Sequence, residues 1–128
     1  TPLNITFTPK QAGNKVILEF TINGDGDHDQ VFLVSRNDVL LADSYGGNNR
    51  WEGIAAGAYD NNISSTPSNY SIRILDLNTL ATESTYKVQV RSSGVSTSTL
   101  YLNRTAANTG ASDYEAMLSV VTATEIWT

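Results

Sequence analysis

Cysteine is absent from this sequence, and histidine occurs once among its 128 residues. The absence of cysteine excludes disulfide bonds, thiolate zinc sites and cysteine nucleophiles together. The single histidine, His28, lies in an acidic stretch. A catalytic triad needs an acid that orients the histidine and a nucleophile that the histidine activates, so a lone histidine in such a stretch is more often a bystander than a general base.

Charge is also sparse, because only 16% of the residues are charged and the formal net charge is −5. The eight lysine and arginine residues are scattered and form no run or stripe. No apolar run approaches the roughly 20 residues of a membrane span, and no basic-then-apolar signal segment opens the chain. We therefore expect no nucleic-acid partner and no membrane insertion.

The clearest pattern in the sequence is the occurrence of apolar residues at every second position. Residues 16–23 place Val16, Leu18, Phe20 and Ile22 on one face and mostly polar residues on the other. This alternation is typical of a strand with one buried face. Further predicted strands, some after turn signals, are residues 31–34 (apolar throughout, hence buried on both sides), 39–41 (after a hairpin turn at 36–38), 70–75, 86–91, 99–102 and 117–127.

The regular spacing of short strands and turns predicts the fold class. We expect an all-β, antiparallel β-sandwich of the jelly-roll type, formed by residues 1–128 as a single domain. Residues 43–69 do not fit this pattern, because they are rich in Gly, Asn and Ser and show weak periodicity. A connection of that length is usually functional or contains structure that the pattern does not reveal.

This long segment also holds the candidate partner-binding residues. Aromatic faces with amide and carboxylate neighbours can hold a sugar or a protein partner. The alternative is that the aromatic rings pin the segment onto the sandwich, because large aromatic side chains are more often buried. The candidates are Tyr45, Arg50, Trp51, Tyr59 and Asp60.

The densest acidic cluster contains the metal candidates Asp25, Asp27 and Asp29, whose alternate spacing would suit a hard cation such as calcium. The EF-hand pattern fails, however, because Gln30 stands where its glycine is needed and Arg36 stands where its bidentate glutamate belongs. The alternative is a solvated loop between two strands. We therefore assign no metal and expect no cofactor.

Enzyme activity has no local signature in the sequence. No nucleophile elbow, phosphate-binding glycine loop or zinc-protease motif is present. A glycosidase needs only two carboxyl groups about 5 to 9.5 Å apart. Asp60, Asp76, Asp113 and Glu115 are candidates for such a pair, but nothing singles out two of them. We therefore predict that the protein is not an enzyme.

Several short elements resemble, in the same order, those of a family of tailed-phage virion proteins. They are residues 5–18 (its first strand), 70–76 (a middle strand that ends in Leu-Asp), 86–92 (its penultimate block), 102–105 (its Leu/Ile-Asn-Arg-Ser/Thr element) and 119–126 (its closing strand). Each element is short, and their shared order carries the resemblance. Residues 43–69 depart from what can be aligned.

The resemblance implies a trimeric jelly roll related in architecture to tumour necrosis factor and to complement globular heads. Similar domains are found in tail fibres, head fibres and capsid-decorating proteins, often at the C-terminus of a longer chain. Residues 1–5 resemble the approach to such a domain, so an upstream anchor is expected. The family has no catalytic residues to carry over. The resemblance implies a location on the virion surface. Besides the other two subunits of the homotrimer, the implied partners are capsid or tail proteins and a host-surface glycan.

The closing strand supplies a physical rationale for a trimer. We expect one set of its side chains to face the core of the subunit: Leu118, Val120 and Ile126. We expect the other set to lie near a symmetry axis between subunits: Met117, Val121, Ala123 and Trp127. The alternative is that a second sheet covers both sets within one subunit.

Two other classes of protein also fit the sequence. One is a secreted carbohydrate-binding module that uses Trp51, and the other is a fragment of a glycoside hydrolase.

Overall fold

The computed structural model describes residues 3–26, 28–41, 53–57, 66–77, 79–92, 98–107, 112 and 114–128. In these ranges the chain consists of strands, turns and loops, with no helix, and therefore no helix that could cross a membrane. The strands are β1 (Asn4–Phe7), β2 (Lys15–Gly26), β3 (Gln30–Arg36), β4 (Val39–Leu40), β5 (Ala55–Gly57), β6 (Ser68–Asp76), β7 (Ser84–Ser92), β8 (Leu100–Leu102) and β9 (Val120–Ile126).

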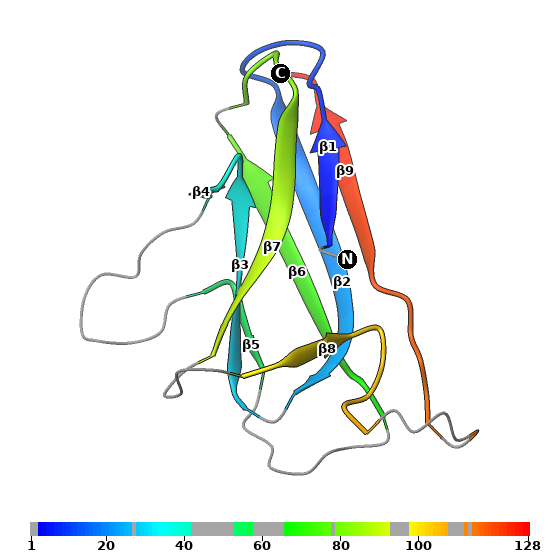
Figure 1. Cartoon of the computed structure of the whole chain (residues 1–128). Coiled ribbons are helices and arrows are strands. Elements are labelled where there is room, and N and C mark those ends of the chain that lie inside the picture. Colours follow the sequence, from blue (N-terminus) through cyan, green and yellow to red (C-terminus); the bar gives the residue numbers. More distant parts are fainter. Residues whose placement is uncertain are drawn as a thin grey trace.

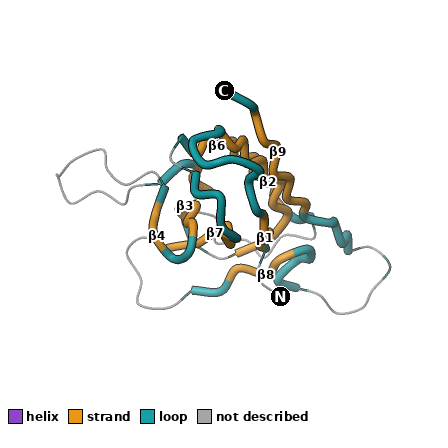
Figure 2. The backbone as a smooth tube through the Cα atoms, turned by 90° about the horizontal axis from the view of Figure 1, so that it is seen from above, coloured by secondary structure: helices purple, strands orange, loops and turns teal. Residues whose placement is uncertain are grey.

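These strands form two antiparallel sheets that pack face to face. In the first sheet the order is β1-β7-β3, and the remaining side of β3 pairs with β4 at one end and with β5 at the other. In the second sheet β2 lies between β6 on one side and β9 and β8 on the other. Figure 1 shows the two sheets from the side, and Figure 2 shows them end on as two layers. The predicted all-β, antiparallel β-sandwich is confirmed.

The hydrophobic core lies between the two sheets. Val16, Leu18, Phe20 and Ile22, the predicted inner face of β2, are at most 1% exposed. Their partners from the first sheet are Phe32, Val34 and Tyr86, with Ile72 of β6 beside them. The period of two in β2 thus predicted the buried face of the strand correctly, because successive side chains of a strand point to opposite faces.

Strand β3 is buried on both faces, as its continuous apolar run predicted. Val31 and Leu33 are 8% and 2% exposed, and Phe32 and Val34 on the opposite face are fully buried. The hairpin that follows is also where the sequence placed it. Asn37 and Asp38 both have positive φ, 49° and 67°, and Arg36 pairs with Val39. Two central residues with positive φ form a type I′ turn, which favours Asn, Asp and Gly.

One edge of strand β2 pairs with β6, and its other edge pairs with two different strands in succession. It pairs with β9 as far as Thr21 and with β8 from Gly24 onward. A side chain at Gly24 would place its Cβ 2.9 Å from the carbonyl oxygen of Tyr101. Glycine therefore permits the close approach of β8 at this position.

A buried ionic network joins β3, β6 and β7. Asp76 is 3% exposed, and its Oδ2 accepts hydrogen bonds from Arg36 Nη1 at 2.7 Å and from the hydroxyl of Tyr86 at 2.9 Å. Burial, reinforced by the hydrogen bond to Asp76, raises the pKa of Tyr86 well above its usual range. Tyr86 therefore stays neutral and donates a hydrogen bond to the carboxylate, so the network ties β6 of the second sheet to β3 and β7 of the first.

Candidate assembly surface

The five residues predicted to bind a partner, Tyr45, Arg50, Trp51, Tyr59 and Asp60, all lie outside the described residues. The same holds for Asp27 of the acidic cluster and for Asp113 of the candidate carboxylate pair. Of residues 43–69 the structure describes 53–57, which include β5, and 66–69, where β6 begins.

The two described members of the acidic cluster, Asp25 and Asp29, both contact neighbouring residues of the fold. Asp25 is 6% exposed, and its Oδ2 accepts a hydrogen bond from the backbone N–H of Ala106 at 2.9 Å. Asp29 lies beside His28, with Oδ1 3.7 Å from Nδ1 of the imidazole. Among the described residues no group of three or more acidic or histidine side chains is placed to hold a metal ion.

The two described members of the candidate carboxylate set have separate structural contacts. Asp76 belongs to the buried network with Arg36 and Tyr86. Glu115 accepts a hydrogen bond from the hydroxyl of Thr66 at 3.1 Å on the surface. Asp76 is thus engaged in holding strands together, which is a structural role.

The expected facing of the closing strand is wrong. Val121 and Ala123, which we expected on the outer face, pack against the hydrophobic core. The physical reason is the register, in which Val121 pairs with Phe20 and Ala123 with Leu18. Residues that pair directly across two strands point to the same face, and Phe20 and Leu18 point into the core.

The opposite set of side chains is therefore the one in solvent. We define the closing-segment strip as the five large apolar side chains that are exposed here, which are Met117 (50% exposed), Leu118 (75%), Val120 (49%), Ile126 (38%) and Trp127 (66%). Leu118, Val120 and Ile126 were expected in the core. The outer positions between them, Thr122 and Thr124, are also exposed. Met117 and Trp127, which we expected away from the core and near a symmetry axis, are exposed in the single subunit.

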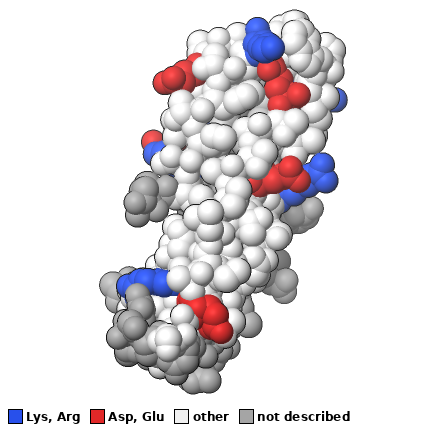
Figure 3. Space-filling model, turned by 90° about the vertical axis from the view of Figure 1, so that its right-hand side faces the viewer, with Lys and Arg blue, Asp and Glu red and all other residues white. Residues whose placement is uncertain are grey.

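Few charged residues lie on the side of the molecule that carries β9. Among residues 117–128 only Glu125 is charged. Seen from this side, most of the surface is uncharged, and the acidic and basic side chains form a few separate groups (Figure 3). Exposed apolar side chains on a surface with little charge are characteristic of a protein–protein interface.

We call residues 117–127 the closing segment. Buried polar contacts anchor its N-terminal end. The backbone N–H of Asn23 donates to Ser119 Oγ at 2.9 Å, and the side-chain amide of Asn23 donates to the carbonyl of Leu118 at 2.9 Å. Asn103 accepts the N–H groups of Met117 and Ser119, through its carbonyl at 3.1 Å and its side-chain oxygen at 2.8 Å. These contacts hold residues 117–119 outside the ladder, so the strand begins at Val120 and not at the predicted Met117.

Asn103 can make these contacts because of its backbone conformation. Its φ is 65°, in the left-handed region that asparagine tolerates better than most residues. Asn103 belongs to the Leu-Asn-Arg-Thr element, whose resemblance carried no structural role for it. Sequence analysis missed Asn23, Asn103 and Ser119 as a cluster, because these residues are far apart in the chain and each is common in turns.

Glu125 anchors the second end of the closing segment. Its Oε1 accepts hydrogen bonds from the Nδ2 of Asn14 at 2.7 Å and from the backbone N–H of Lys10 at 2.8 Å. The bond from Asn14, together with those from the backbone of Lys10 and Gln11, lowers the pKa of Glu125. The turn that follows β1 is thereby tied to β9.

We expect the replacement of Glu125 by glutamine to flatten the pH dependence of stability. A carboxyl group whose pKa is lower in the folded protein stabilises the fold at a pH above its ordinary value, 4.5. That contribution is lost as the pH falls through the folded value. Urea unfolding of Glu125→Gln should therefore differ most from the unchanged protein at neutral pH and least near pH 3. Glu83→Gln, in an exposed turn, controls for the loss of one charge; parallel pH curves for Glu125→Gln and the unchanged protein would refute this role.

Comparisons of the chain with protein-family models, with curated proteins and with solved structures found no match.

Proposed function

We propose that this protein is a non-enzymatic structural domain of a tailed-phage virion, and that it assembles as a homotrimer through the closing-segment strip. The observation that carries the assembly is the exposure of five large apolar side chains, between 38% and 75%, on one short segment. Exposed apolar patches often mark sites of protein–protein contact, and three of the five side chains, Met117, Leu118 and Val120, lie within four consecutive positions. In a symmetric trimer each strip would be covered by the other two subunits.

The order of the elements that resemble phage virion proteins supports the virion assignment. Residues 5–18 form most of β1 and the start of β2, and residues 70–76 and 86–92 lie on β6 and β7. Residues 102–105 include Asn103, which anchors the closing segment, and residues 119–126 cover β9. The resembling elements are thus the frame of the sandwich and the anchors of the proposed interface.

The proposed role is geometric. The two sheets, the buried ionic network and the two polar anchors make a rigid body on which the strip is held in a fixed direction. A rigid threefold unit would present its loops outward on the capsid or the tail. Host-surface attachment, for example to a glycan, would then use the loops and no catalytic group.

Phage particles purified from a culture that produces this protein provide the test. We expect the protein to copurify with intact particles, and antibody against it should label the particle surface in electron micrographs. Antibody preincubated with the purified domain is the control and should leave the particles unlabelled. The virion assignment would be refuted if the protein stayed in the soluble lysate and were absent from particles that are otherwise complete.

A further inference from the structure

The sandwich has an apolar cavity between its two sheets, lined in part by Leu3, Ile22 and Val90. In the first sheet, β1 pairs with β7 only as far as Asn4 opposite Lys87, and the carbonyl of Leu3 accepts the N–H of Val88. Within the described residues, Val90 therefore has a strand neighbour only on the β3 side, and it is 44% exposed. Among the described residues, no strand therefore pairs with the edge of β7 at Val90.

The second sheet is interrupted at the same level. Strand β2 pairs with β9 as far as Thr21 and with β8 from Gly24, so Ile22 lies in the interval between the two partners. The two interruptions face each other across the core. The cavity between them has a volume of about 130 Å³ and is partly open to solvent.

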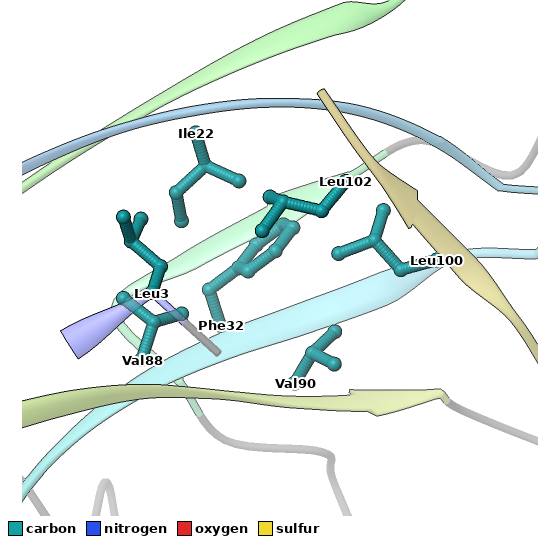
Figure 4. A pocket seen from close by; sticks show the side chains of 7 residues that line it. All are labelled: Leu3, Ile22, Phe32, Val88, Val90, Leu100 and Leu102. Atoms are coloured by element: carbon teal, nitrogen blue, oxygen red, sulfur yellow. The ribbon is translucent and has the colours of Figure 1, made fainter. Parts of the chain in front are cut away.

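The side chains that line this cavity are all apolar. Phe32 and Ile22 are buried in its depth, and the partly exposed Val90 lies toward solvent. Figure 4 shows the side chains converging from both sheets and from the N-terminal segment. The complete lining is Leu3, Ile22, Phe32, Val88, Val90, Leu100 and Leu102.

This chemistry restricts what can occupy the cavity. Ordered water needs two to four polar partners, and none of the lining side chains offers a hydrogen-bond donor or acceptor. A charged group would be desolvated there without a partner. The volume is below the roughly 300–1,000 Å³ of sites for larger ligands and close to the about 150 Å³ of an apolar cavity that accepts benzene.

The geometry points to a binding site for a small uncharged apolar molecule, with a single ring or a short alkyl chain. The site shares no residue with the closing-segment strip and does not depend on the proposed trimer. A bound molecule would replace the missing contacts of Ile22, Val88 and Leu102, since a cavity that is empty forfeits dispersion contacts on its lining. The ligand would therefore also stabilise the fold.

Methyl nuclear magnetic resonance of the intact chain tests this inference, with benzene and 1-pentanol as separate probes. We expect saturable shifts of the methyl signals of Ile22, Val88, Val90, Leu100 and Leu102 with at least one probe. A response to benzene alone would identify a ring site, and a response to 1-pentanol alone would identify an alkyl site. The absence of a saturable shift with both probes would overturn the inference.

A pair of matched variants locates the probe. Val90→Phe should fill the cavity from its open side and weaken binding by about tenfold or more. Val39→Phe, at a valine that is 70% exposed on β4, should leave binding unchanged. Equal binding by both variants would place the probe elsewhere and overturn the inference.

If Val90→Phe does not fold, nuclear Overhauser effects between the probe and the unchanged protein locate the bound probe. Contacts from the probe to Ile22 and Leu102 would support the cavity. Contacts confined to Leu118 and Val120 on the outer surface would overturn it.

Discussion

Replacing Asp76 by alanine is expected to lower the free energy of unfolding by about 3 kcal/mol or more. Asp76 is 3% exposed, and one of its oxygens accepts hydrogen bonds from both Arg36 and Tyr86. The substitution leaves the guanidinium, which is only 21% exposed, without its nearest carboxylate. It also leaves the buried Tyr86 hydroxyl without its acceptor. Removal of one member of a buried ionic contact costs more than the contact itself contributes, because the remaining group stays desolvated.

Urea unfolding at a fixed protein concentration measures this effect, since assembly would make stability depend on concentration. The matched control is Glu19→Ala, which removes a carboxylate from an exposed pair with Arg73 at 3.7 Å. Exposed pairs of this kind contribute about 0–1 kcal/mol. Tyr86→Phe should fall between the two, at about 1.5–3 kcal/mol, because it removes one hydrogen bond to a charged group. If Asp76→Ala were as mild as Glu19→Ala, the network would not contribute substantially to holding β6 against β3 and β7.

The second large effect is expected on assembly. A protein with glutamate at both Leu118 and Val120 should remain monomeric at micromolar concentration. In the proposed trimer these side chains, 75% and 49% exposed in the single subunit, would be covered by neighbouring subunits. Six carboxylates would then be desolvated and close to one another, and desolvation of each unpaired charge costs several kcal/mol. Each 1.4 kcal/mol changes the association constant about tenfold.

Sedimentation velocity compares this double variant with the unchanged protein. Val39→Glu is the matched control, because Val39 is 70% exposed on the other sheet and lies outside the closing-segment strip. We expect the control to sediment as the unchanged protein does. Because Leu118 and Val120 are exposed, the double variant should keep its fold, which circular dichroism verifies. A trimer that persisted in the double variant would exclude these two side chains from the interface.

The sequence was sufficient where apolar residues occur on one face only. The alternation from Val16 to Ile22 has a single interpretation, because the other face of the strand is mostly polar. The continuous run at residues 31–34 and the Asn37-Asp38 turn were equally unambiguous, since few local structures fit them. All three were found where they were predicted.

The closing strand could not be oriented in the same way. Residues 117–127 carry apolar side chains on both faces, with Leu118, Val120 and Ile126 alternating with Val121 and Ala123. A shift of one residue exchanges the two faces, so the sequence pattern fits either orientation. Pairing with β2 selects one of them, and that pairing joins residues about 100 positions apart. The small Ala123 fits against the core, while the larger Leu118 and Ile126 remain outside.

The polar contacts between distant residues could not be predicted from the sequence, for a similar reason. Asn23 and Ser119 are separated by 96 positions and Arg36 and Asp76 by 40. Each residue alone looks like an ordinary turn or surface residue, and only the folded topology brings the partners together. The polar networks of a sandwich therefore follow from its topology and cannot be derived from local sequence pattern.

Static light scattering of the purified chain at micromolar concentration tests the central claim most directly. The account predicts a particle of three times the 13.8 kDa mass of the chain. A uniform species of 13.8 kDa over the same concentration range would contradict it.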